Sequence, residues 1–124
     1  MAGTHQDLRG WRESIHFTVE VYRETRGLPD SEKFGLTSQL RRASVSIPSN
    51  LSEGAARDST VEYVRCITIA IASASEVDTQ LEISRRLGFL SNDSALRLLT
   101  RVNQITRMLL SLRTSIRNRI DEAK

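Results

Sequence analysis

Residues Leu40–Gly54 read LRRASVSIPSNLSEG and place a proline inside a stretch whose apolar residues recur at helical spacing. A proline within a helix lacks the N–H donor and clashes with the carbonyl group four residues earlier, which costs about 3 kcal/mol. A chain tolerates this where neighbouring structure compensates or where a bend is useful. We therefore expect a helix over residues 34–56 that is kinked at Pro48. Its apolar stripe consists of Leu36, Leu40, Ala43, Ile47 and Leu51.

Polar residues surround Pro48 at helical spacing, on the side away from that stripe. They could form a network that satisfies the backbone groups freed by the proline and pairs Glu53 with Arg42 or Arg57. Alternatively, they could contact a ligand or RNA. Both interpretations stay open from the sequence alone. The residues of this structural motif are Ser46, Pro48, Asn50, Glu53 and Gly54.

Three further segments show the apolar periodicity of amphipathic helices, and no segment shows the alternation of a strand. We expect these helices at about residues 7–26, 59–87 and 91–119. The helix over 59–87 begins at a capping box formed by Ser59 and Glu62. The stripes expected to face the core are Leu8, Trp11, Ile15, Val19 and Tyr22 in the first helix, Tyr63, Ile67, Ala70, Ala74, Val77 and Leu81 in the third, and Leu98, Val102, Ile105, Leu109, Leu112 and Ile116 in the fourth.

Four helices joined by short turns favour an antiparallel up-down-up-down four-helix bundle. The chain of 124 residues fits one domain over residues 1–124, large enough to bury an independent core. Its single cysteine, Cys66, excludes an internal disulfide bond and a cysteine-based zinc cluster. No apolar run approaches the roughly 20 residues of a membrane span, and the N-terminus lacks a signal-peptide pattern. We therefore expect a cytoplasmic protein with no membrane partner.

The first and third helices carry more apolar residues than one buried face requires. A helix that is apolar on nearly all sides is buried on both sides, which a bundle of this size cannot achieve by itself. We therefore predict a homo-oligomer whose interface lies on the outer faces of these two helices. A competing interpretation is that scattered surface hydrophobic residues are normal. The predicted interface residues are Phe17, Val21, Val61, Ile69, Ala72 and Ile83.

Arginine dominates the positive charge: of the 18 lysines and arginines, all except Lys33 and Lys124 are arginine. The planar guanidinium group suits phosphate and carboxylate. Residues 97–119 contain six arginines and no acidic residue. This pattern is typical of a phosphate-facing surface, although a solvated helix face would show it too. The predicted nucleic-acid contacts are Arg41, Arg42, Arg57, Arg97, Arg101, Arg107, Arg113, Arg117 and Arg119.

Motifs of catalysis, metal binding and cofactor binding are absent from the sequence. It has no glycine-rich phosphate loop, no G-x-S-x-G and no H-E-x-x-H. Glu76, Asp78 and Glu82 share one expected helix, but metal sites in bundles use E-x-x-H motifs, which the chain lacks. We therefore expect no enzyme activity, no catalytic residues, no metal and no cofactor.

Several short segments together resemble the four-helix-bundle proteins encoded in intervening sequences of bacterial 23S ribosomal RNA genes. They are FGLTSQLRRA at 34–43, SIPSN at 46–50, EG at 53–54, EVDTQLEI at 76–83 and LGFL at 87–90. The resemblance spans about residues 7–115. It implies an all-α bundle and, as in studied relatives, a five-fold ring with a basic surface, so that the expected homo-oligomer is a pentamer.

A related branch of that family consists of accessory proteins of diversity-generating retroelements, which bind nucleic acid and a reverse transcriptase. The resemblance and the arginines together imply a non-enzymatic, oligomeric nucleic-acid-binding protein. Its expected partner is structured RNA such as rRNA, with DNA or a nucleic-acid-processing protein as further possibilities. The alternative is a protein-interaction scaffold or accessory factor that docks an acidic protein partner without direct RNA binding.

Overall fold

The computed structural model describes the backbone of residues 5–123 and the side chains of residues 7–120. Four long helices and one short 3-10 helix make up this part of the chain, and it contains no strand. The elements are α1 (His5–Thr25), η1 (Asp30–Glu32), α2 (Leu36–Ala55), α3 (Thr60–Arg86) and α4 (Asn92–Ala123). The prediction of an all-α, four-helix fold is confirmed.

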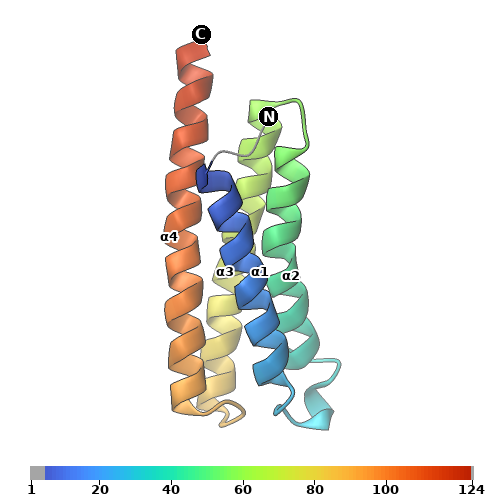
Figure 1. Ribbon diagram of the computed structural model, residues 1–124. Helices are drawn as coiled ribbons and strands as arrows, with labels where there is room; N and C mark the ends of the chain where they lie inside the picture. Colours follow the sequence, from blue (N-terminus) through green and yellow to red (C-terminus); the bar gives the residue numbers. More distant parts are fainter. Residues whose placement is uncertain (1–4, 124) are drawn as a thin grey trace.

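The four helices form one bundle in which successive helices run in opposite directions (Figure 1). α1 contacts α2 and α4, and α3 contacts the same two helices. α4 is the longest helix, and its C-terminal turns extend beyond the ends of the other three (Figure 1). It continues to Ala123, past the expected end at residue 119, because the intervening residues include neither glycine nor proline.

Local hydrogen bonds set both ends of α3. At its start, the Ser59 hydroxyl accepts a hydrogen bond from the backbone N–H of Glu62, as the capping box predicts. At its end, Gly88 adopts a left-handed backbone conformation with φ 77°. The N–H of Phe89 then donates to the Ser84 carbonyl at 2.9 Å, which closes the helix in a Schellman-type cap. Glycine suits this position because it has no Cβ to strain.

The predicted core stripes of α3 and α4 are confirmed, since all of their residues are 2% exposed or less. The stripe of α2 is also buried, apart from Leu36, which is half-buried and packs against the core. Burial of these side chains is the main favourable contribution to folding, about 25 cal/mol for each Å² of apolar surface removed from water.

The predicted inner face of α1 is wrong. Phe17 and Val21, which the sequence assigned to an oligomer interface, are fully buried in the core of the bundle. Most of the stripe expected to face inward is instead exposed: Val19 is 43% and Trp11 37% exposed, Leu8 and Tyr22 are similar, and Ile15 is half-buried. Both stripes satisfy helical spacing, so periodicity alone does not decide between them.

Apolar periodicity did not predict the buried face of α1, because this face includes polar residues. Ser14 and Thr25 lie on the same face as Phe17 and are 2% exposed or less. The Ser14 hydroxyl donates to the Trp11 carbonyl at 2.8 Å, and the Thr25 hydroxyl donates to the Val21 carbonyl at 2.7 Å. A buried hydroxyl that is hydrogen-bonded avoids most of the free-energy cost of leaving water. A face with two such residues can therefore be the inner one.

Pro48 lies buried inside α2, and its compensation comes from a different helix. Without a proline N–H, the carbonyl of Ser44 has no donor four residues later in the helix. The hydroxyl of Thr18 in α1 donates to this carbonyl at 3.1 Å and also contacts the Ser14 carbonyl at 2.8 Å. The backbone group freed by the proline is thus satisfied by tertiary structure. A bend of the helix axis at Pro48 stays a prediction.

One residue of the predicted motif, Ser46, links α2 to α3, and Asn50 supports it from within α2. The Ser46 hydroxyl lies 2.8 Å from the hydroxyl of the buried Ser73, and the Asn50 amide donates to the Ser46 carbonyl and hydroxyl. Glu53 pairs with Arg57 at 2.9 Å, one of the two partners considered from the sequence. These contacts support the interpretation of the motif as a structural network.

Replacing Thr18 with valine is expected to lower the free energy of unfolding by about 1–2 kcal/mol. The substitution keeps the side-chain shape but leaves the buried Ser44 carbonyl without a donor. Chemical denaturation followed by circular dichroism measures the change, and Thr18→Ser, which keeps the hydroxyl, serves as the control. In a Pro48→Ala background the helix regains its N–H, so the cost of Thr18→Val should shrink. If Thr18→Val lowered the free energy of unfolding equally in both backgrounds, the Thr18 hydroxyl would not be the group that compensates for Pro48.

Candidate nucleic-acid interface

The arginines predicted to contact nucleic acid do not form one continuous surface. On α4, Arg97 and Arg101 contact carboxylates of α1, whereas Arg113 donates to the Thr68 hydroxyl of α3 at 3.2 Å. The arginines of α4 therefore flank the helix on both sides. Their spacing in the sequence did not reveal this division, because it depends on which helices pack against α4.

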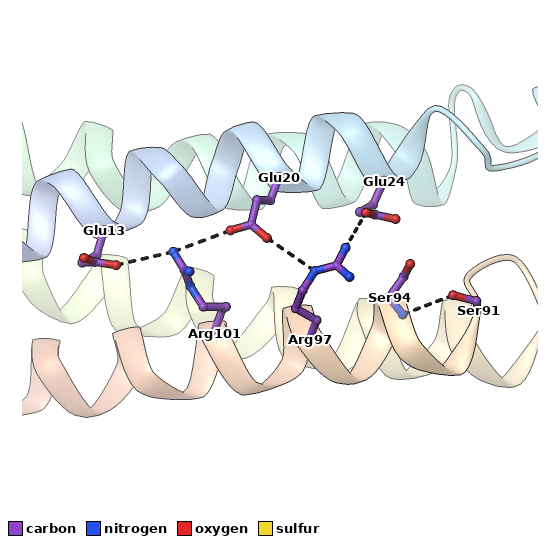
Figure 2. A network of polar contacts seen from close by, with 7 residues as sticks. All are labelled: Glu13, Glu20, Glu24, Ser91, Ser94, Arg97 and Arg101. Carbon is purple, nitrogen blue, oxygen red and sulfur yellow. Dashed lines mark hydrogen bonds and ion pairs between the residues drawn. The ribbon is translucent and has the colours of Figure 1, made fainter.

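An ion-pair ladder joins the N-terminal half of α4 to α1 (Figure 2). Arg97 contacts Glu24 at 2.5 Å and Glu20 at 3.8 Å. Arg101 contacts Glu13 at 3.4 Å and the other oxygen of Glu20 at 3.6 Å. Near the start of the ladder, the Ser91 hydroxyl accepts from the backbone N–H of Ser94 and caps α4 (Figure 2).

The ion-pair ladder makes Arg97 and Arg101 less available to bind phosphate. All five of its side chains are partly exposed, so each pair contributes only about 0–1 kcal/mol to stability. Their positive charge is nevertheless compensated by carboxylates within 4 Å. A phosphate group would have to compete with those carboxylates, so Arg97 and Arg101 are weaker candidates for phosphate binding than the sequence indicates.

Two predicted contact residues outside α4 are also engaged within the chain. Arg41 donates to the Thr25 hydroxyl at 2.9 Å and to the Tyr22 carbonyl at 3.3 Å. Its guanidinium group also lies over the Tyr22 ring, 4.7 Å from the ring centre, which is a cation–π contact. Arg57 pairs with Glu53. Arg41 therefore ties α2 to α1, and its first role is structural.

The remaining predicted arginines keep uncompensated charge. Within residues 7–120, no carboxylate lies at ion-pair distance from Arg42, Arg107, Arg113 or Arg117. Arg42, Arg107 and Arg117 are exposed. Arg119 is half-buried and lies close enough to affect the phenol of Tyr63. The C-terminal half of α4 is thus the part of the predicted surface that remains available to an anion.

The structure adds Arg9 and Arg12 of α1, which the sequence analysis missed. Arg9 lines a groove of about 680 Å³ between α1 and α4, opposite Arg101 and Arg107. We call this the basic groove. Glu13 is the one carboxylate in its lining, which also includes Gln104, Ser111, Ile105 and Met108. Arg9 and Arg12 are three residues apart on one helix, and this spacing is the sequence signal that would have pointed to the surface.

A second groove between the same two helices has a different charge balance. It measures about 660 Å³ and is lined by three glutamates and three arginines, together with His16 and Val19. We call this the balanced groove; its charged residues are Glu13, Glu20, Glu24, Arg23, Arg97 and Arg101. The two grooves share Glu13 and Arg101. The seam between α1 and α4 therefore changes from nearly neutral to basic along its length.

Apolar side chains remain exposed on two helices. The outer stripe of α1 borders a cavity of about 380 Å³ in which Trp11 and Leu8 face Leu51, Ala55 and Tyr63. On α3, the predicted interface residues Val61, Ile69, Ala72 and Ile83 are all exposed, Val61 the most at 66%. These surfaces replace Phe17 and Val21 as the residues available to a second copy of the chain.

The strongest electrostatic perturbations belong to structural groups. Hydrogen bonds from Arg85 and Arg86 lower the pKa of the Glu82 carboxyl to about 2. Burial, together with the nearby Asp7 carboxylate, raises the pKa of the Tyr63 hydroxyl well above its usual value. Among residues 7–120, no group of three His, Cys, Asp or Glu side chains is placed to hold a metal ion. Within the described helices, none is both long and apolar enough to cross a membrane.

Comparison with known proteins identifies the fold. The model of the family described as 23S rRNA-intervening sequence protein matches residues 6–111. A crystal structure of a protein of unknown function from the S23 ribosomal protein family of Bacteroides thetaiotaomicron has a TM-score of 0.82 to this chain. The two share 22% sequence identity, over 88% of this chain and 98% of that one, which shows a common fold alone. No curated protein matches the sequence.

Proposed function

This chain belongs to the family of 23S rRNA-intervening sequence proteins, and from that premise we propose that it is a non-enzymatic, oligomeric protein that binds structured RNA such as rRNA. The observation that carries the proposal is the uncompensated charge of Arg107, Arg113 and Arg117 on the C-terminal half of α4. Lysine and arginine side chains that neutralise phosphates supply most of the sequence-independent affinity for nucleic acid.

Recognition through the phosphate backbone fits the composition of the chain better than base stacking. Only 5% of its residues are aromatic. Of these, Phe17 and Tyr63 are buried, and Arg41 lies over one face of the Tyr22 ring. The exposed Trp11 and Phe34 lie in different elements, on α1 and in the turn before α2, so they offer no run of neighbouring aromatic rings. Proteins that bind single strands rely on exposed aromatic platforms for successive bases. We therefore expect a preference for folded RNA, with weak dependence on base sequence.

Oligomerisation forms part of the proposal because it would multiply these contacts. The exposed stripe of α1 and the exposed apolar residues of α3 lie on different sides of the chain and offer surfaces for a second copy. A ring of such copies, a pentamer as the resemblance implies, presents several arginine surfaces to one RNA molecule. Several weak sites on one assembly bind RNA more tightly than a single site does, because contact at the first site raises the effective concentration of the RNA at the others.

Titration with RNA at two salt concentrations tests the proposed function. Fluorescence anisotropy of labelled structured RNA should show binding that weakens at least about tenfold between about 50 and 200 mM salt, because three phosphate contacts per subunit release bound counterions. Single-stranded RNA and duplex DNA of equal length serve as comparison ligands. Absence of binding at low salt, or binding that does not depend on salt, would contradict the proposal.

The second candidate function is a scaffold that docks an acidic protein partner without contacting RNA. The apolar cavity beside Trp11 favours it, since exposed apolar patches with a charged rim often mark protein interfaces. This function predicts weak, unselective binding to RNA and saturable binding to a protein. The same titration therefore distinguishes the two candidates.

A further inference from the structure

We infer that the basic groove between α1 and α4 is a binding site for a phosphate group of the RNA backbone, distinct from the rest of the arginine surface. The inference rests on the proposed function and specifies where the strand is held. Arg9 from α1 and Arg107 from α4 line the groove, and neither has a carboxylate at ion-pair distance within residues 7–120. An anion between them can accept hydrogen bonds from both helices.

The charge of the groove favours an anion. Three arginines and one glutamate line it, which leaves an excess of two positive charges at neutral pH. The single glutamate, Glu13, contacts Arg101 at 3.4 Å and holds that guanidinium group at one end of the groove. Arg9 and Arg107 remain available for the ligand.

The balanced groove provides an internal comparison on the same seam. It has nearly the same volume, about 660 Å³ against about 680 Å³, and is formed by the same two helices. Its three arginines are matched by three glutamates, however, so it offers no excess positive charge. Size alone therefore does not distinguish the two grooves, and their charge predicts that phosphate enters only the basic one.

The rest of the lining suits one phosphodiester and its sugar. Gln104 and Ser111 add polar groups to the lining, and the partly buried Met108 and the buried Ile105 add apolar surface. Ligand sites commonly combine an apolar surface with a few placed polar groups. A volume of about 680 Å³ is enough for a nucleotide unit. The chemistry recognised is that of a phosphate ester, whether it belongs to RNA or to a free nucleotide.

Two double variants with the same change in net charge test the site. Arg9→Gln with Arg107→Gln removes both available arginines of the basic groove. Arg23→Gln with Arg26→Gln removes two exposed arginines, one in the last turn of α1 and one just after it, at the end of α1 away from Arg9. We expect the first variant to bind structured RNA at least about tenfold more weakly, with the slope of log affinity against log salt reduced by about two. The second should stay within about twofold of the wild type.

Each outcome of this comparison has a separate meaning. Equal losses in the two double variants would overturn the groove and leave the proposed function standing, because binding would then follow overall charge. Wild-type affinity in the first variant would also overturn the groove alone. If the wild-type chain does not bind RNA at all, the proposed function fails and the groove fails with it. Circular dichroism melting confirms that both variants are folded.

A gain in affinity gives a test that misfolding cannot imitate. Glu13→Gln removes the one carboxylate of the basic groove and should tighten RNA binding about threefold. Glu24→Gln makes the same change of charge in the balanced groove, where it should have a smaller effect. Titration with a mononucleotide in place of RNA separates a general phosphate site from one that needs a strand. Equal gains in RNA affinity from both substitutions would overturn the assignment of the phosphate site to the basic groove.

Discussion

Phe17→Ala is expected to lower the free energy of unfolding by about 3–5 kcal/mol, the largest effect predicted for this chain. The Phe17 side chain is fully buried among the four helices. Truncation removes its transfer free energy and leaves a cavity that the surrounding helices fill only in part. The loss is comparable to the whole stability of many small domains, so chemical denaturation should be followed from the lowest denaturant concentration.

The matched control lies on the other side of the same helix. Val19→Ala removes apolar atoms from a residue that is 43% exposed and should change stability by less than about 0.5 kcal/mol. Phe17→Leu, a milder truncation at the buried site, keeps the test decisive if the alanine variant does not fold. If Phe17→Ala were harmless while Val19→Ala unfolded the protein, the orientation of α1 described above would be wrong.

Gly54→Ala is expected to lower the free energy of unfolding by about 2–3 kcal/mol. A Cβ atom at this position would lie 2.7 Å from the Cys66 Cβ and 2.9 Å from a ring carbon of Tyr63. Real Cβ atoms do not approach so closely, so α2 and α3 would have to separate. The cost of overpacking exceeds the roughly 1 kcal/mol that alanine gains over glycine within a helix. Thermal and chemical denaturation measure the difference.

Gly10 supplies the control for that substitution, because it is also buried within a helix. A Cβ atom there would lie 3.7 Å from a methyl group of Leu109 and 3.8 Å from the Met108 sulfur, which are ordinary contacts. Gly10→Ala should therefore raise stability by about 0.5–1 kcal/mol. Opposite signs for the two alanine variants would show that close packing, and not helix propensity, explains Gly54. A stabilising Gly54→Ala would contradict this explanation.

Much of the fold follows from patterns within single helices. The stripes of α3 and α4 repeat at spacings of four and three residues, and their burial in the structure matches this periodicity. Ser59 with Glu62 and Gly88 mark the two ends of α3 through hydrogen bonds between residues close in sequence. These signals are local, so one sequence is enough to interpret them.

The candidate site was predicted less well than the fold. The abundance of arginine on α4 is a property of composition, and it correctly drew attention to this helix. Which of those arginines remain available depends on the acidic residues of α1, which lie 73–88 positions earlier in the chain. The same holds for Arg9, whose position opposite Arg107 arises only when α1 packs against α4.

The sequence by itself determined the number of helices, their approximate ends, the buried faces of α2, α3 and α4, and the family. Tertiary structure decided which face of α1 turns inward, which hydroxyl satisfies the Ser44 carbonyl, and which arginines are compensated. The physical reason is the range of the interactions. Helical periodicity and capping act within a few residues, whereas a buried hydroxyl or an ion pair gains its partner only when distant helices meet.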